Sequence, residues 1–170
     1  LDMDETLLTQ WFVRGNAVGE KREGTVQVQV RDTVPSYVDR KTGNSLEKAS
    51  VVYSPNVVQI RPGVLDFMQK VEEVPGFQGF IIFTAKEDRA AWDLYRAWER
   101  AQPEVFNDVI GFYTRNYLRF DPSLKKPSKD LRMFDPSLEH IILVDDNESR
   151  VLQRDLNYRI PKFNADEYLR

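Results

Sequence analysis

The chain has 170 residues, of which 41% are hydrophobic, and a net charge of −3, which fits one globular domain over residues 1–170 and gives no electrostatic support for binding nucleic acid or an anionic membrane. It has no cysteine and a single histidine, His140, which excludes disulfides and thiolate chemistry and argues against a multi-histidine zinc site or a histidine-based triad. No apolar run is long enough to span a bilayer and no signal peptide is recognisable, so we expect an intracellular location, cytoplasmic or nuclear.

The chain opens with two aspartates, Asp2 and Asp4, that are separated by one residue and followed by Thr6. Alternate residues of an extended strand point to the same side, so the two carboxylates can converge where a strand ends. Carboxylates so close repel each other unless a cation or a shared proton offsets the charge, and Mg²⁺ suits them because it takes oxygen ligands. One carboxylate can then attack phosphorus while the other moves a proton. A threonine-capped turn with solvated acids is the simpler alternative.

Only Leu1 precedes this acid pair, and the sequence does not start with methionine. A nucleophile at the end of a strand needs a strand that leads to it. We therefore expect that residues upstream of Leu1 are missing from this sequence, with processing of a longer chain as the alternative.

The segment of residues 8–57 is predicted to be a β-rich insertion of two or three antiparallel strands. Residues 25–30 alternate valine with polar side chains, which is the period of a half-exposed strand. Residues 50–53 and 57–60 are further strand candidates, separated by residues 54–56, which include a proline.

Two helices are predicted after the insertion. An Arg-Pro-Gly string at residues 61–63 precedes apolar residues spaced as one helical face, with the proline near the helix start. The residues of this face are Val64, Phe67, Met68 and Val71. A second helix is predicted over residues 87–101, where an aromatic stripe at helical spacing indicates packing into the core.

Three strands are predicted between and after these helices. Residues 80–83 and 141–144 are short, continuous apolar runs of the kind found in strands buried on both faces. Residues 109–113 form a further strand candidate, and a short helix is expected from about residue 149.

The order of strand, insertion, helix, strand, helix, strand and helix predicts an α/β fold: a Rossmann-like parallel sheet with helices on both faces. No loop after Thr84 is long enough to form a large cap. Ligands of such sheets bind beyond the carboxyl ends of the strands. Polar residues follow three of the predicted strands there, namely Asp2 with Asp4, Thr84, and Asp145 with Asp146.

Each of these groups has a chemical task at such an edge. Asp2 would attack a phosphate group, while Asp4 would protonate the leaving oxygen and later deprotonate the attacking water. Thr84 would donate a hydrogen bond to a phosphoryl oxygen, and Lys129 would neutralise charge on the phosphate and on Asp2. One of the acids at residues 145–146 would complete the ligand set for Mg²⁺.

Five short strings of the sequence resemble, in order, the motifs of the haloacid dehalogenase superfamily of phosphohydrolases. They are Asp-Met-Asp-Glu-Thr-Leu at residues 2–7, Arg-Pro-Gly-Val at 61–64, Phe-Thr-Ala at 83–85, Lys-Asp-Leu at 129–131 and Val-Asp-Asp-Asn at 144–147. Within the superfamily, the chain most resembles the phosphatases acting on the C-terminal domain of RNA polymerase II and their small, NLI-interacting-factor-like relatives. Each string alone is weakly specific, but the ordered set is strongly so, and it implies a haloacid dehalogenase-like fold.

The resemblance implies that Asp2 is the nucleophile and that Asp4 is the acid/base, which also binds the metal through its backbone carbonyl. It implies that Thr84 and Lys129 bind phosphate. Mg²⁺ would be held by the two aspartates of the first motif together with Asp146.

Other charged residues near the motifs receive secondary roles. Asp145 would orient the lysine or a metal-bound water. Lys125 and Lys126 are alternatives for that lysine, although the residues around Lys129 match the motif better. Arg115 and Arg119 follow a predicted strand and are candidates for binding the substrate phosphate, since a guanidinium fits its geometry. His140 is expected to be a surface or edge residue.

The implied function is that of a Mg²⁺-dependent phosphoprotein phosphatase acting through an aspartyl-phosphate on phosphoserine, phosphothreonine or phosphotyrosine. A small-molecule phosphatase of the same superfamily is the first alternative, and the absence of a long cap segment favours the protein substrate. A catalytically silent phosphate-binding module is the second alternative, which the presence of every motif residue disfavours. The insertion matches the family only in position and β-rich character, and the oligomeric state stays open.

Overall fold

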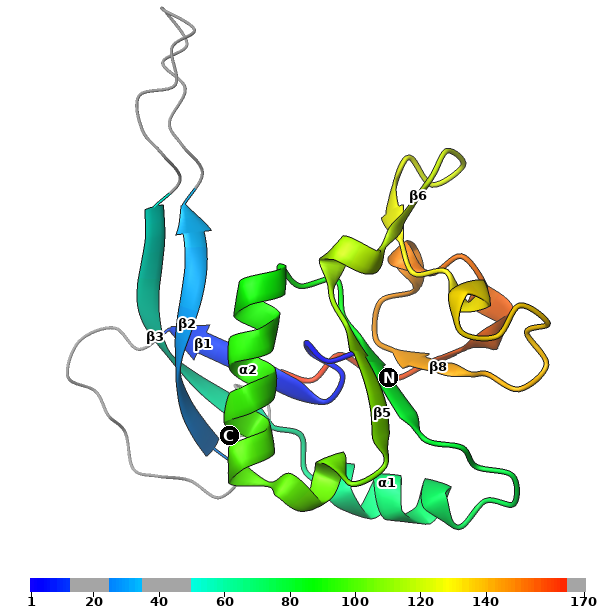
Figure 1. The fold of residues 1–170 in the computed structure, drawn as a ribbon, viewed down its shortest axis with the longest axis horizontal. Coiled ribbons are helices and arrows are strands. Elements are labelled where there is room, and N and C mark those ends of the chain that lie inside the picture. Colours follow the sequence, from blue (N-terminus) through cyan, green and yellow to red (C-terminus); the bar gives the residue numbers. More distant parts are fainter. Residues whose placement is uncertain (13–24, 35–49, 165–170) are drawn as a thin grey trace, which may run out of the picture.

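The computed structural model describes residues 1–12, 25–34 and 50–164, with side chains described for residues 1–8 and 58–164 (Figure 1). Two pairs of parallel strands form its centre: β4 (Phe80–Phe83) with β5 (Val109–Tyr113), and β8 (Leu143–Asp145) with β9 (Asn157–Arg159). Within the described residues, no helix is long and apolar enough to cross a membrane.

The start of the chain joins these two strand pairs. The backbone N–H of Phe83 donates to the carbonyl of Leu1 at 2.8 Å, and the N–H of Asp2 donates to the carbonyl of Val144 at 2.9 Å. Residues 1–2 therefore lie between β4 and β8, in the place of a central strand. The predicted α/β fold with parallel neighbours is confirmed, and the carboxyl end of this central segment is where Asp2 stands.

The predicted β-rich insertion is a three-stranded antiparallel sheet in the order β1–β3–β2. Its strands are β1 (Leu8–Phe12), β2 (Thr25–Val34) and β3 (Ser50–Ile60). The prediction of two separate strands around residues 54–56 was wrong, because β3 runs through them without a break. Pairing with β1 ends at Asn56, so among the described strands Pro55 has a neighbour only on the β2 side, and a residue without an N–H is tolerated at such an edge.

Both predicted helices form, as α1 (Val64–Glu72) and α2 (Asp88–Ala101). Gly63 precedes α1 with φ of 80°, a left-handed conformation that glycine adopts without strain. Glu87 caps α2 by accepting a hydrogen bond from the N–H of Ala90 at 3.3 Å. The apolar faces of both helices join β4 in one buried cluster.

Shorter elements complete the fold. They are the hairpin strands β6 (Arg119–Asp121) and β7 (Lys126–Ser128), and the 3₁₀ helices η1 (Pro103–Phe106), η2 (Arg115–Tyr117), η3 (Leu131–Met133), η4 (Glu148–Arg150) and η5 (Arg154–Leu156). The short helix expected from about residue 149 is therefore two 3₁₀ turns. The side chain of Asn147 caps the first of them by accepting from the N–H of Ser149 at 3.0 Å.

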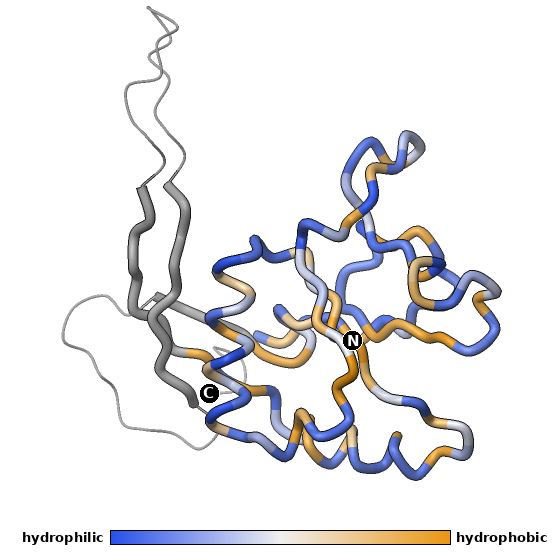
Figure 2. Tube along the Cα trace, in the orientation of Figure 1, coloured by the Kyte–Doolittle hydropathy of each residue, from blue (hydrophilic) through white to orange (hydrophobic). Residues whose placement is uncertain are grey.

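The strand predicted over residues 141–144 begins later than expected, at Leu143, and ends at Asp145. The side chain of Ile142 is 66% exposed, so the apolar run of residues 141–144 is not a strand that is buried along its whole length. Hydrophobic stretches nevertheless run through the central strands, while the outer loops are largely hydrophilic (Figure 2).

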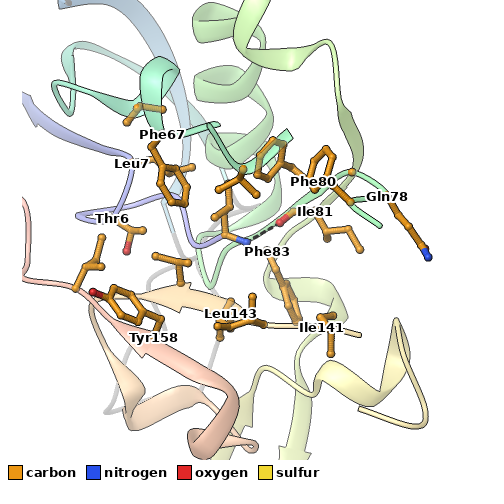
Figure 3. A pocket seen from close by; sticks show the side chains of 18 of the residues that line it. Thr6, Leu7, Phe67, Gln78, Phe80, Ile81, Phe83, Ile141, Leu143 and Tyr158 are labelled. Atoms are coloured by element: carbon orange, nitrogen blue, oxygen red, sulfur yellow. Dashed lines mark hydrogen bonds between the residues drawn. The ribbon is translucent and has the colours of Figure 1, made fainter. Parts of the chain in front are cut away.

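Ile141 and Ile142 line a mostly apolar cavity of about 790 Å³ beneath the central strands. Phe67 of α1 and Tyr158 of β9 border the same space, and Ile81 of β4 forms part of its wall (Figure 3). The two isoleucines thus border this cavity although they lie outside the strand.

Candidate active site

A buried lysine joins two of the predicted site residues. Nζ of Lys129 lies 2.6 Å from Oδ1 of Asp2 and 2.7 Å from Oδ2 of Asp145, and the lysine side chain is only 2% exposed. The backbone holds it there, since the N–H of Lys129 donates to the carbonyl of Arg150 at 2.7 Å and its carbonyl accepts from Leu152 at 3.0 Å. The structure thus brings together residues that the sequence places in three different motifs.

The charges of this cluster are unequal. Burial is the largest influence on Asp2 and raises the pKa of its carboxyl to about 7, although Lys129 opposes the rise. Burial alone would lower the pKa of Lys129, but the carboxylates of Asp2 and Asp145 outweigh it and raise that pKa. Both directions fit a charged lysine that faces two carboxyl groups and can balance only one negative charge. A cation or a proton must offset the other.

Asp4 lies beside this cluster and is held by the turn that follows β4. Its Oδ2 accepts a hydrogen bond from Oγ1 of Thr84 at 3.3 Å, and its Oδ1 lies 3.1 Å from Nζ of Lys86. Glu5 has φ of 61°, so the chain turns sharply directly after Asp4. The two aspartates of the first motif therefore have different partners, one a buried lysine and the other a half-buried one.

Three carboxylates could hold a divalent metal ion together. Oxygen atoms of Asp2, Asp145 and Asp146 all lie within 4.8 Å of one another. Thr6 fixes the third of these, because its Oγ1 donates to Oδ1 of Asp146 at 3.0 Å and accepts from the backbone N–H of Asp146 at 3.1 Å. Hard oxygen donors with surplus negative charge suit Mg²⁺ or a similar ion. The side chain of Asp4 is outside this group, so metal binding through its carbonyl stays a prediction.

A cavity of about 320 Å³ opens above these residues. It is lined by Asp2, Asp4, Glu5, Thr84, Ala85, Lys86, Arg115, Lys129, Asp145, Asp146, Asn147 and Arg150. The predicted catalytic, phosphate-binding and metal-binding residues all lie in this lining, and so does Arg115.

Other candidates from the sequence lie elsewhere. Arg119 pairs with Asp130 at 3.3 Å, which makes it part of a structural ion pair. The rival lysines Lys125 and Lys126 are outside the lining of the site cavity. His140 is exposed, as expected for a surface residue.

Sequence reasoning missed two cations of the site, Lys86 and Arg150. Lys86 stands two residues after Thr84, so its closeness to the motif was a usable signal. Arg150 reaches the site because η4 follows β8 and brings the carbonyl of Arg150 to the N–H of Lys129, and no sequence pattern marks this turn.

Comparisons with known proteins bear on the family and the fold of the chain. The chain matches the family model of the NLI interacting factor-like phosphatases over residues 1–169. No curated protein sequence gives a significant match. Similar solved structures include the structure of Fcp1, an essential RNA polymerase II CTD phosphatase, with a TM-score of 0.63 at 14% sequence identity.

That structural match covers 96% of this chain and 41% of the Fcp1 chain, so this chain spans about two fifths of that protein's length. At this identity the likeness shows a shared fold, which confirms the haloacid dehalogenase-like architecture. The match to the family model extends over residues 1–169, the stretch in which all of the strings discussed above lie. The chain therefore belongs to the NLI interacting factor-like phosphatase family, a family of phosphoric monoester hydrolases.

Proposed function

We propose that the chain is a protein phosphatase of the haloacid dehalogenase type that uses a divalent metal ion, Mg²⁺, and forms an aspartyl-phosphate on Asp2. The observation that carries this proposal is the buried contact of Lys129 with Asp2 and Asp145 at the carboxyl ends of the central strands. An ion-pair network there orients one carboxylate oxygen and leaves negative charge that only a cation or a proton can offset.

In the first step, a carboxylate oxygen of Asp2 attacks phosphorus and the bond from phosphorus to the ester oxygen breaks. Asp4 gives its proton to that leaving oxygen, so the alcohol departs uncharged. Thr84 and Lys129 donate hydrogen bonds to the phosphoryl oxygens, where negative charge must be stabilised in the transition state. Thr84 already contacts Asp4, so one short turn positions both the acid and a phosphate ligand.

In the second step, Asp4 takes a proton from a water molecule, and the oxygen of that water attacks the phosphorus of the aspartyl-phosphate. The bond from phosphorus to the Asp2 oxygen breaks, which releases inorganic phosphate and restores the carboxylate. Nζ of Lys86 lies 3.1 Å from Oδ1 of Asp4 and would hold the carboxyl group of Asp4 in position for both proton transfers.

The metal ion would be held by Asp2, Asp145 and Asp146, with Asp4 contributing its backbone carbonyl. When bound, it would supply positive charge that draws the phosphate group and the nucleophile together. Thr6 would keep Asp146 in its ligand position through the two hydrogen bonds between them.

The proposed substrate is a protein phosphorylated on serine, threonine or tyrosine. Support comes from the family and from the site cavity, which is bordered by residues of five separate segments, among them the exposed Arg115. Arg115 would bind the substrate beside its phosphate. The phosphatase activity of the related Fcp1 on the RNA polymerase II CTD is consistent with a protein substrate for this chain.

Phosphate release from matched phosphoserine, phosphothreonine and phosphotyrosine peptides tests the proposal. We expect turnover that depends on Mg²⁺ and is abolished by a chelator. Asp2→Asn and Asp4→Asn should each reduce this turnover to background. Hydrolysis of small phosphate esters but of none of the peptides would indicate the metabolite phosphatase. Absence of both activities in a folded, Mg²⁺-loaded protein would refute the catalytic proposal.

A further inference from the structure

Four cationic side chains line the site cavity beside five acidic ones, and in the described part of the chain two of the four have no acidic partner. Lys129 already faces two carboxylates, and Lys86 faces Asp4. Arg115 and Arg150 also line the cavity, and neither forms an ion pair with a carboxylate among the described residues. Two guanidinium groups that line the site cavity are therefore available to bind a ligand.

The two arginines stand on opposite sides of the nucleophile. Arg115 begins η2, directly after β5, whereas Arg150 ends η4, which follows β8. The central segment that carries Asp2 lies between β4 and β8, and β5 lies beyond β4. A peptide chain that crosses the carboxyl ends of these strands with its phosphate at Asp2 would pass one arginine before the phosphorylated residue and the other after it.

The backbone ties both arginines to the site. The N–H of Arg115 donates to the carbonyl of Lys86 at 3.0 Å, and its Nε donates to the carbonyl of Ala85 at 2.8 Å. These contacts leave the two terminal nitrogens of the guanidinium without a hydrogen bond among the described residues. The carbonyl of Arg150 accepts from the N–H of Lys129, so its position is fixed relative to the phosphate-binding lysine.

We propose that Arg115 and Arg150 select substrates that carry a further anionic group on each side of the phosphorylated residue. This inference rests on the phosphoprotein phosphatase function proposed above and names its substrate class. The planar guanidinium pairs with the two oxygens of a carboxylate or a phosphate, so glutamate, aspartate or a second phosphorylated residue supplies the same chemistry. Arg115 is exposed and Arg150 is half-buried, so dissolved salt screens their charges. Their contribution to substrate binding should therefore weaken as the salt concentration rises.

Peptides that differ only beside the phosphoserine test the inference. One has neutral flanks, one has glutamate on both sides, one has a second phosphoserine, and one has lysine on both sides. We expect the wild-type kcat/KM to be highest for the anionic flanks and lowest for lysine, with the difference shrinking as salt is raised. Arg150→Gln should reduce the preference for glutamate over neutral flanks by about fivefold, which is the upper range for an exposed ion pair. Arg115→Gln should reduce it similarly.

The matched control is Arg154→Gln, which removes the same charge from an exposed arginine outside the site cavity and should leave the preference unchanged. Hydrolysis of p-nitrophenyl phosphate by the wild-type protein checks the proposed function separately. If that ester is hydrolysed but the four peptides react equally, or if Arg150→Gln lowers all four alike, the inference is refuted while the phosphatase function stands. Preference for the second phosphoserine over glutamate would identify phosphate as the flanking anion, and equal rates for both would show that a carboxylate suffices.

Discussion

Lys129 is the residue whose replacement tests the site most directly. In Lys129→Met, an uncharged side chain of similar length replaces a lysine that is 2% exposed and contacts Asp2 and Asp145 at 2.6 and 2.7 Å. One positive and two negative charges then become two buried negative charges. Removing one partner of a buried ion pair destabilises a protein by about 3–5 kcal/mol, and we expect the free energy of unfolding to fall by that amount in chelator.

A second substitution separates charge from packing. Asp145→Asn in the Lys129→Met background removes one of the two carboxylates that have lost their lysine partner. The cluster of residues 2, 129 and 145 then has the same net charge of −1 as in the wild-type protein. We expect this second substitution to recover about 1–3 kcal/mol of the lost stability, as is found for residues in direct contact. It should not recover catalysis, because the lysine that would donate to the phosphoryl oxygens is still absent, and we expect kcat to stay lower by at least about 100-fold.

Urea unfolding followed by tryptophan fluorescence measures the stability, and p-nitrophenyl phosphate hydrolysis with Mg²⁺ measures the activity. Lys70→Met, the same exchange at an exposed position of α1, is the control and should change neither. An unchanged unfolding midpoint for Lys129→Met, or a further loss of stability on adding Asp145→Asn, would refute the assignment of a charged lysine between two carboxyl groups.

Three further predictions concern pH, the metal and the core. Without metal, thermal stability should fall as the pH rises from about 4 to 7, because burial raises the pKa of Asp2 to about 7 and the folded chain keeps a proton that the unfolded chain has released. Asp2→Asn or added Mg²⁺ should flatten this slope in thermal melts, and a wild-type midpoint independent of pH would contradict it. Thr6→Val removes both hydrogen bonds to Asp146 and should weaken Mg²⁺ binding by about tenfold in calorimetry, whereas unchanged affinity would exclude a role in positioning that ligand. Leu94→Ala, which empties a fully buried site in α2, should lower the free energy of unfolding by about 2–5 kcal/mol in urea titrations. The folded fraction of this variant should keep its activity, and a large loss per folded molecule would show that α2 positions the site.

The local elements were predictable because their signals are local. The 3.6-residue period predicted both helices, and α2 starts one residue later than expected because Glu87 serves as its cap. The prediction failed where a neighbouring strand decides the outcome. Pro55 continues β3 because, of the two described strands that pair with β3, only β2 pairs at this position, and Ile142 lies outside β8 although it belongs to the apolar run.

The part of the candidate site that lies directly at the strand ends was predictable, because the carboxyl ends of parallel strands meet at one edge of the sheet. Asp2, Thr84 and Asp145 follow from that rule, whereas the choice of Lys129 over its neighbours came from the family resemblance. Lys86 and Arg150 could not be placed from sequence periodicity, because both reach the cavity through irregular turns whose direction depends on tertiary contacts.

The contacts that build the site also tie activity to the completion of folding. The pair of Lys129 with Asp2 joins residues 127 positions apart, and the bond from Thr6 to Asp146 joins residues 140 positions apart. Closing such long loops carries an entropic penalty that the rest of the fold must offset, so these contacts form only when the chain is nearly native. During refolding, recovery of phosphatase activity should therefore lag behind the helix signal in far-ultraviolet circular dichroism. A chain cleaved between Thr6 and Lys129 should regain turnover only when the two fragments reassociate.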